Sequence, residues 1–553
     1  MSDTLSPAPV DRLVPRPRKV TAREDCFVLD AATTVFAGPG AEGMAETFRR
    51  YLAAPTGFEL PRSDLRASEP PAGAIVLSLD AGQDGLGAEG YQLTVGAEGV
   101  RLRAAAPAGL FYGLQTFRQL LSPEIYRAAP AGESRWVASG AEIEDAPRFA
   151  WRGAMLDVGR YFMPLSFVKR FVDLLSAHKF NVLHLHLTED QGWRFPSQRY
   201  PRLTEAGSWR SATMRGFRGQ DGSDGTPHGG YYRPEDLKEL VQYAAARFVT
   251  IVPEIDLPGH TQAAIAAYPE LGNTGEKLPV STHWSIHTHV LNMEPQTVDF
   301  CRDVLGELAD IFPGTFIHIG GDECPREEWE NSQAAKARAV ELGLQDGVAG
   351  LQAWFTGQMN EYLAGRGRQL IGWDEIVEGG LPPGAAVMAW RNEEAGFEAA
   401  AAGHDVVLAP KNVTYFDYYQ SDGPDEPLAI GGLTTLRDVY RYEPVPANLP
   451  PDAAAHVLGT QFQVWTEYIP TPDDVEYMTF PRACAFAEVA WTEGPRDWQE
   501  FQPRLSRHLL RLDALDVNYR PLEGPHPWQR GGEGVRKRRP AEGTESSTTR
   551  MRL

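Results

Sequence analysis

Residues 316–323 read FIHIGGDE, and the pattern of this stretch recurs along much of the chain. Ile317 and Ile319 alternate with a histidine, as in a strand, and two glycines then allow the backbone to bend and present Asp322 and Glu323 at the end of the strand. Short apolar runs separated by longer helical segments are typical of repeated βα units. Eight such runs occur, at residues 152–160, 181–189, 250–260, 316–323, 369–375, 385–390, 405–410 and 457–467. The sequence therefore predicts an α/β protein with a closed (β/α)8 TIM-type barrel.

A barrel accounts for only part of the chain, because 553 residues exceed one ordinary core. We expect a flexible N-terminal segment at 1–20, a smaller accessory α/β domain at 21–148, the catalytic barrel at 149–522 and a polar, disordered tail at 523–553. Within the accessory domain, GYQLTV and VRLRA alternate around the turn at 96–99 and predict a hairpin.

Composition excludes several classes of partner. A net charge of −21 repels phosphate backbones and anionic membranes, so nucleic acid and membrane surfaces are not expected partners. The sequence also lacks the run of roughly 18 apolar residues that a membrane helix needs. The four cysteines are far apart, which favours reduced thiols over disulfides or a structural zinc site. The first residues contain no apolar stretch of the kind found in secretory signals, so we expect a cytoplasmic protein. The negative net charge favours a neutral substrate.

Polar and aromatic residues gather where the predicted strands end, which is the catalytic end of such a barrel. These residues are Arg160, Glu189, Asp190, Asp256, His260, Asp322, Glu323, Trp373, Trp390 and Glu467.

The adjacent acids Asp322 and Glu323 restrict the chemistry. Neighbouring side chains in a strand point apart, so these two cannot face each other across a glycosidic bond, as the two carboxylates of most retaining glycosidases do. A second carboxylate across the bond is not needed if a group of the substrate itself acts as the nucleophile. In a 2-acetamido sugar the carbonyl oxygen can close on C1 to form an oxazolinium ion, with Glu323 as proton donor and Asp322 holding the acetamido group.

Over roughly residues 150–500, the sequence resembles family-20 glycoside hydrolases, the β-N-acetylhexosaminidases. Eight motifs match that family's sequence blocks in order. They are LDVGRYFMP, KFNVLHLHLTEDQGWR, GGYYRPEDLKELVQYAAAR, VPEIDLPGHTQAA, HIGGDE, GWDE, WTEY and FPRACAFAEVAW. The N-terminal domain resembles the family's accessory domain more weakly. The resemblance implies a retaining exo-enzyme that removes terminal non-reducing GlcNAc or GalNAc from small molecules or oligosaccharides, such as chitooligosaccharides, without metal or cofactor.

The resemblance also implies a role for each site residue. Asp322 would orient the acetamido N–H, Glu323 would be acid and then base, and Tyr415 would bind the acetamido carbonyl oxygen. Aromatic walls would enclose the acetamido methyl group and the sugar face, and further groups would clamp the outer hydroxyls or support Glu323. The walls are Trp373, Trp390 and Trp465, the clamp is Arg160, Glu467 and Asp417, and the supporting network contains Asp256 and His260, with Glu189 where many family members carry Asp.

Two other functions compete with this interpretation. His184 and His186 alternate on one strand, as metal ligands do in barrel amidohydrolases, although buried hydrogen-bond partners are the alternative explanation. A non-catalytic sugar-binding protein could also keep the fold, but the retained Asp322, Glu323 and Tyr415 argue against it. The sequence leaves the gluco or galacto preference and the oligomeric state open.

Overall fold

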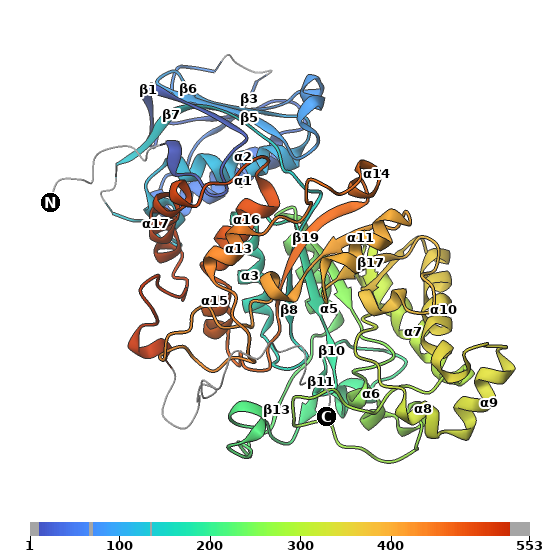
Figure 1. The fold of residues 1–553 in the computed structure, drawn as a ribbon. Coiled ribbons are helices and arrows are strands. Elements are labelled where there is room, and N and C mark those ends of the chain that lie inside the picture. Colours follow the sequence, from blue (N-terminus) through green and yellow to red (C-terminus); the bar gives the residue numbers. More distant parts are fainter. Residues whose placement is uncertain (1–9, 66–69, 133–134, 531–553) are drawn as a thin grey trace. The chain divides into compact units, whose positions relative to one another are not determined.

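The computed structural model describes residues 10–65, 70–132 and 135–530, and its chain divides into two compact units (Figure 1). The first unit contains 1–150, 174–180 and 480–519, and the second contains 151–173, 181–479 and 520–553. Residues 1–9 of the predicted flexible segment and 531–553 of the predicted tail lie outside the described residues. Within 10–20, the side chains of Leu13 and Val14 are buried.

The first unit is built on a seven-stranded mixed sheet with the order β1-β7-β5-β6-β4-β2-β3. The hairpin predicted around residues 96–99 is confirmed, because β5 and β6 pair antiparallel from Gly96 with Gly99 to Tyr91 with Ala104. The strands are β1 (Lys19–Leu29), β2 (Val35–Ala37), β3 (Arg62–Asp64), β4 (Ala74–Leu79), β5 (Tyr91–Gly96), β6 (Gly99–Ala104) and β7 (Trp136–Asp145). The helices are α1 (Glu42–Thr56), α2 (Pro107–Leu120), α16 (Arg482–Trp491) and α17 (Trp498–Ala514).

The second unit is the predicted barrel. All eight apolar runs form strands, and these close in the order β14-β15-β16-β17-β18-β19-β8-β9 with parallel pairing throughout. The strands are β8 (Trp151–Asp157), β9 (Val182–His186), β14 (Thr250–Glu254), β15 (Phe316–His318), β16 (Gln369–Trp373), β17 (Ala386–Ala389), β18 (Val406–Leu408) and β19 (Val457–Val464). Two short ribbons pair β10 (Thr188–Glu189) with β11 (Gly192–Trp193) and β12 (Trp209–Arg210) with β13 (His228–Gly229).

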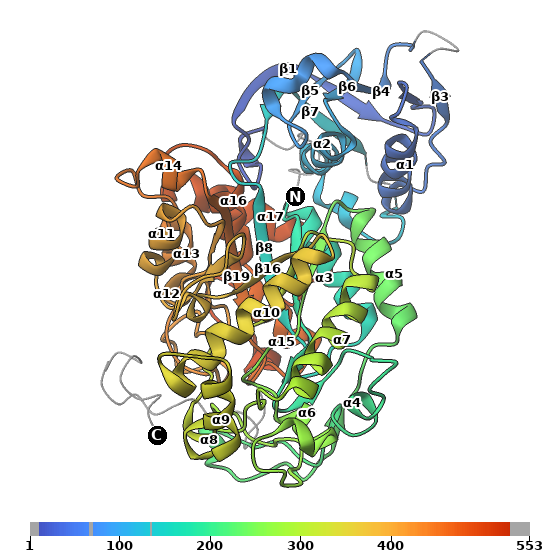
Figure 2. The same ribbon diagram turned by 90° about the vertical axis from the view of Figure 1, so that its right-hand side faces the viewer.

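Helices cover the outside of the barrel, and Figure 2 shows α5, α7 and α10 side by side there. Helix α5 begins at Pro234, where the missing N–H costs no hydrogen bond, and it buries Leu237, Leu240 and Ala244. The helices are α3 (Leu165–Ala177), α4 (Arg202–Glu205), α5 (Pro234–Ala245), α6 (Gln262–Ala267), α7 (Pro295–Ile311), α8 (Glu327–Asn331), α9 (Gln333–Glu341), α10 (Leu351–Gly365), α11 (Glu393–Ala401), α12 (Lys411–Thr414), α13 (Leu436–Arg441), α14 (Pro451–Ala454) and α15 (Pro472–Thr479). In the described part of the chain, no helix has the length and apolar character needed to cross a bilayer.

Candidate active site

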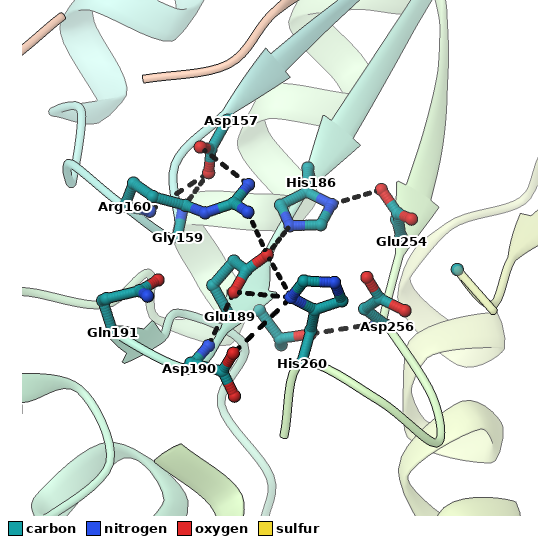
Figure 3. Close-up of polar contacts among 12 residues, drawn as sticks. Asp157, Gly159, Arg160, His186, Glu189, Asp190, Gln191, Glu254, Asp256 and His260 are labelled. Atoms are coloured by element: carbon teal, nitrogen blue, oxygen red, sulfur yellow. Dashed lines mark hydrogen bonds and ion pairs between the residues drawn. The ribbon is translucent and has the colours of Figure 1, made fainter. Parts of the chain in front are cut away.

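The predicted site residues lie at the carboxyl end of the barrel. Because the eight strands are parallel, their carboxyl ends share one end of the barrel. Asp157 ends β8, Glu189 ends β10, and Asp256 and Asp322 follow β14 and β15. Figure 3 shows that side chains from several of these segments converge around Glu189.

The turn after β15 sets the two acids side by side. Gly320 and Gly321 have φ values of 68° and 98°, and Glu323 has a φ of 43°. A Cβ atom on Gly320 would lie 1.8 Å from Asp256 Oδ1, so that position requires glycine. The same oxygen accepts the backbone N–H of Gly321 at 3.1 Å. Since glutamate rarely adopts a positive φ, the surrounding structure holds Glu323 in a conformation that its own backbone disfavours.

His260 connects the two acids to a buried acidic pair. Its Nε2 lies 3.8 Å from Asp322 Oδ2 and 3.8 Å from Glu323 Oε2. Its Nδ1 lies 3.1 Å from Glu189 Oε1 and 3.5 Å from Asp190 Oδ2 (Figure 3). Burial opposes a charge on this ring, but Glu189 and Asp190 outweigh that effect and hold the pKa of His260 well above its usual value. The imidazolium therefore places a positive charge beside both acids.

The carboxyl group of Glu323 is suited to exchange a proton near neutral pH. Burial raises the pKa of Glu323 to about 7, the His260 cation opposes this rise, and Asp322 adds to it. The side chain is still 22% exposed, so a ligand in the barrel mouth can reach it. Asp322 Oδ1 is buried and has no hydrogen-bond partner among the described residues, which leaves an acceptor for a ligand N–H.

Arg160 lies among three carboxylates at the same end of the barrel. Its Nη2 is 2.6 Å from Glu189 Oε1 and 3.8 Å from Glu467 Oε1, and its Nη1 is 3.3 Å from Asp157 Oδ2. Its guanidinium carbon also lies 4.9 Å from the centre of the Trp465 ring. Burial raises the pKa of Glu467, and its Oε2 has no hydrogen-bond partner within the described chain. Arg160 can thus donate a hydrogen bond to a hydroxyl group, and Glu467 can accept one.

Glu189 contacts both Arg160 and His260 through its carboxylate. Burial disfavours its charge, but Arg160 and His260 hold the pKa of Glu189 well below its usual value. It also accepts the backbone N–H of Asp190 at 2.8 Å. Glutamate at this position therefore reaches the imidazole of His260 while it pairs with the guanidinium group.

Four aromatic side chains pack against one another at the carboxyl ends of the strands. The rings of Trp390 and Tyr415 stack at 6.0 Å, Tyr415 lies 6.3 Å from Trp465, and Trp465 lies 5.7 Å from Trp373. Trp373 is only 1% exposed and contacts the rings of buried histidines, so it forms the base of this group. Asp417 is buried two residues beyond Tyr415. The roles of these residues toward a sugar stay predictions.

A buried carboxylate below this group was not predicted as a site residue. Glu254 at the end of β14 lies 3.0 Å from His184 Nε2 and 3.0 Å from His318 Nδ1, and it accepts the indole N–H of Trp373 at 2.9 Å. It also contacts His186 Nδ1 (Figure 3). A charged residue at the end of the apolar run TIVPE is the sequence signal that could have identified it.

These contacts bear on the metal-ligand interpretation of His184 and His186. Ligand atoms of His184, Glu254 and His318 lie within 4.8 Å of one another. However, His184 Nδ1 accepts from Gln461 Nε2 at 3.0 Å, and His184 Nε2 lies 3.0 Å from Glu254 Oε2. Both ring nitrogens of His184 are therefore used within the protein, as expected of a buried hydrogen-bond partner.

The comparisons with known proteins agree with this geometry. Residues 149–494 match the family described as glycosyl hydrolase family 20, catalytic domain, and residues 11–146 match domain 2 of the same family. A β-hexosaminidase of Porphyromonas gingivalis is 39% identical over 94% of this chain and 65% of that protein. A β-N-acetylhexosaminidase of Cellulomonas fimi is 34% identical over 92% of this chain and 95% of that protein.

Solved structures give the same result. The family-20 β-N-acetylhexosaminidase of Streptomyces coelicolor A3(2) superposes with a TM-score of 0.81 at 33% identity, over 94% of this chain and 99% of that chain. The family-20 exo-β-N-acetylglucosaminidase of Vibrio harveyi, solved in complex with N-acetylglucosamine, superposes with a TM-score of 0.80 at 32% identity, over 93% of this chain and 78% of that chain. This chain therefore belongs to glycosyl hydrolase family 20 and is a glycoside hydrolase of the β-N-acetylhexosaminidase class.

Proposed function

We propose that this enzyme is a retaining exo-β-N-acetylhexosaminidase that uses the acetamido group of its substrate as the nucleophile. One observation carries the proposal: a single nitrogen, His260 Nε2, lies 3.8 Å from an oxygen of Asp322 and 3.8 Å from an oxygen of Glu323. Both acids therefore lie close together, beside the same imidazole. Two carboxylates in this arrangement suit a reaction in which the attacking oxygen belongs to the sugar.

In the first step, Glu323 donates its proton to the glycosidic oxygen. The acetamido carbonyl oxygen attacks C1, the C1–oxygen bond to the leaving group breaks, and an oxazolinium ion forms. Asp322 accepts the acetamido N–H and stabilises the positive charge that develops on the nitrogen. Tyr415 donates a hydrogen bond to the acetamido oxygen.

In the second step, Glu323 acts as a base. Its carboxylate takes a proton from water, the water oxygen attacks C1, and the ring oxygen of the oxazolinium returns to the acetamido group. Two inversions at C1 give net retention. A pKa of about 7 suits both roles, since Glu323 must hold a proton in one step and release it in the other.

The groups around Arg160 support chain-end attack. The ion pair of Arg160 with Glu467, together with buried Asp417, offers hydrogen bonds to the outer hydroxyls of a terminal sugar. A sugar whose outer hydroxyls are bound in this way is held by its non-reducing end, which favours removal of single units from the chain end. Terminal GlcNAc or GalNAc on glycans or short chitooligosaccharides is the substrate class that we propose.

The test compares two substrates on enzyme treated with a chelator. Initial rates are measured on an aryl N-acetyl-β-glucosaminide and on the matching aryl β-glucoside, which lacks the acetamido group. We expect hydrolysis of the first alone. Equal rates would refute acetamido participation, and activity on neither would favour the sugar-binding or metal-enzyme alternatives.

A second measurement isolates Asp322. The Asp322→Asn variant loses the charge that stabilises the oxazolinium, so turnover should fall by about 10² to 10³-fold with an unchanged circular dichroism spectrum. A rate close to that of the wild type would contradict the mechanism.

A further inference from the structure

The acidic residues that follow β16 hold the residues that follow β17. Asp374 Oδ2 accepts the backbone N–H groups of Trp390 at 3.2 Å and Arg391 at 3.1 Å, and Asp374 Oδ1 lies 2.6 Å from Arg391 Nε. The next residue, Glu375, accepts the indole N–H of Trp390 through Oε2 at 2.9 Å. Asp374 thus fixes the backbone of this segment, whereas Glu375 fixes one side chain.

Trp390 differs from the other aromatic residues of the site in how it is held. Trp373, Trp465 and Tyr415 are buried members of one core cluster, while Trp390 is only partly buried and packs against that cluster. One face of its ring stacks on Tyr415 at 6.0 Å, and Lys411 Nζ lies 5.1 Å from its centre. Stacking leaves an indole free to slide and turn in its plane, so the directional hydrogen bond to Glu375 decides where the ring lies.

We propose that Glu375 is a positioning residue that limits the size of the N-acyl group the enzyme accepts, by holding the indole of Trp390 against Tyr415. The inference rests on the proposed function, in which Trp390 forms part of the wall around the acetamido methyl group. Without this hydrogen bond, the indole of Trp390 can move away from Tyr415, and the site can accept a longer acyl chain.

Because the carboxyl group of Glu375 is protonated, glutamine at this position is a matched control for the hydrogen bond. Burial, with Asp322 and Asp374 nearby, raises the pKa of Glu375 to about 9, so its carboxyl group carries a proton at neutral pH. The neutral amide in Glu375→Gln keeps an oxygen that accepts the indole N–H. Glu375→Leu has a similar volume but no acceptor. A comparison of the two variants therefore separates the hydrogen bond from the volume of the side chain.

A second control uses the neighbouring acid Glu378. It pairs with Arg391 Nη1 at 2.8 Å and is exposed, and its hydrogen bond goes to Arg391 and not to the indole. Glu378→Ala removes an acid from the same segment and should leave Trp390 in place.

The experiment measures kcat/KM on aryl β-glucosaminides that carry N-acetyl or N-butanoyl groups. The wild type should prefer the acetyl substrate, and Glu375→Leu should reduce that preference by about tenfold, which is within the range that hydrophobic pockets give for added methylenes. Glu375→Gln and Glu378→Ala should keep the preference within about twofold. An unchanged preference in Glu375→Leu, even with a lower rate on both substrates, would overturn the inference.

A double-mutant cycle tests whether Glu375 acts through Trp390. Trp390→Phe lacks the N–H, so Glu375→Leu should not change the acyl preference further in that background. Equal effects in both backgrounds would overturn the inference. Failure of the proposed function is recognised separately, because the wild type would then hydrolyse the aryl β-glucoside as well as the N-acetyl substrate.

Discussion

Two glutamates at the carboxyl end of the barrel, Glu254 within the end of β14 and Glu323 in the turn beyond β15, have opposite pKa shifts although both are largely removed from solvent. Glu254 receives contacts from three histidines and the indole N–H of Trp373, and against burial the histidines hold its pKa well below the ordinary value. Glu323 makes no hydrogen bond through its carboxyl group among the described residues, and its pKa rises to about 7.

The difference shows that burial alone does not decide the charge of a carboxyl group. Burial raises the pKa of both residues, and the number of nearby donors and cations then determines whether that rise survives. At the end of β14, enough donors surround Glu254 to keep it ionised. At the mouth, His260 at 3.8 Å and, to a smaller extent, Arg160 oppose the rise. Burial and the nearby acids outweigh both cations, so Glu323 keeps a proton that it can donate. We therefore expect Glu254 to contribute to stability and Glu323 to catalysis.

The largest expected effect is the loss of activity in Glu323→Gln. Removal of the general acid should lower kcat by about 10² to 10⁴-fold on an alkyl β-N-acetylglucosaminide, whose leaving group needs a proton. A dinitrophenyl leaving group needs little protonation, so the loss in the first step should be much smaller with that substrate. Single-turnover rates on both substrates check this. Equal losses on the two would indicate that another group is the acid.

Glu254→Gln should act on stability instead. The substitution keeps the shape but removes the carboxylate nearest the His186 cation in a buried site. Glu189 at 3.6 Å remains as a counter-charge, so the cost should be at most about 3 to 5 kcal/mol. Urea unfolding followed by tryptophan fluorescence measures the change, with Glu323→Gln as the control that should not lose stability. A Glu254→Gln enzyme as stable as the wild type would show that the contacts between Glu254 and the buried histidines contribute little to the fold.

Features that lie within one segment could be predicted from the sequence, whereas contacts between different strands could not. The eight strands were predictable because each is a short apolar run between turn signals, and the acids Asp322 and Glu323 because two glycines follow such a run. The partners of Glu254 were not, since His184, His186 and His318 come from two other strands that meet it only when the barrel closes. Glu375 lies two residues after Trp373 in the GWDE motif, but its hydrogen-bond partner Trp390 follows a different strand.

His260→Asn should change the pH dependence of catalysis. The general acid must be protonated, so kcat/KM falls as pH rises through the pKa of Glu323, about 7. The His260 cation stabilises the ionised form and lowers that pKa, and its loss should therefore move the alkaline limb upward by about one pH unit. His456→Asn, which removes a half-exposed histidine paired with Asp405, is the control. An alkaline limb that stays in place would indicate that His260 does not set the proton affinity of Glu323.

The smallest expected effect is a pH-dependent gain in stability in Glu323→Gln. At about pH 4, glutamate is largely protonated in both the unfolded and folded protein, so the substitution should have little effect. Between the unfolded value and the folded pKa of about 7, the unfolded chain releases its proton and the folded protein does not, so stability falls as pH rises. Above pH 7 the folded protein carries the full cost of a buried charge at the mouth of the barrel. The neutral amide avoids that cost, and its melting temperature should exceed that of the wild type by about 1 to 3 °C at pH 8. Calorimetry at both pH values measures this, and Glu254→Gln should shift the melting temperature in the opposite direction. A gain of equal size at pH 4 would mean that the amide stabilises the site through packing and that Glu323 carries no stored electrostatic cost.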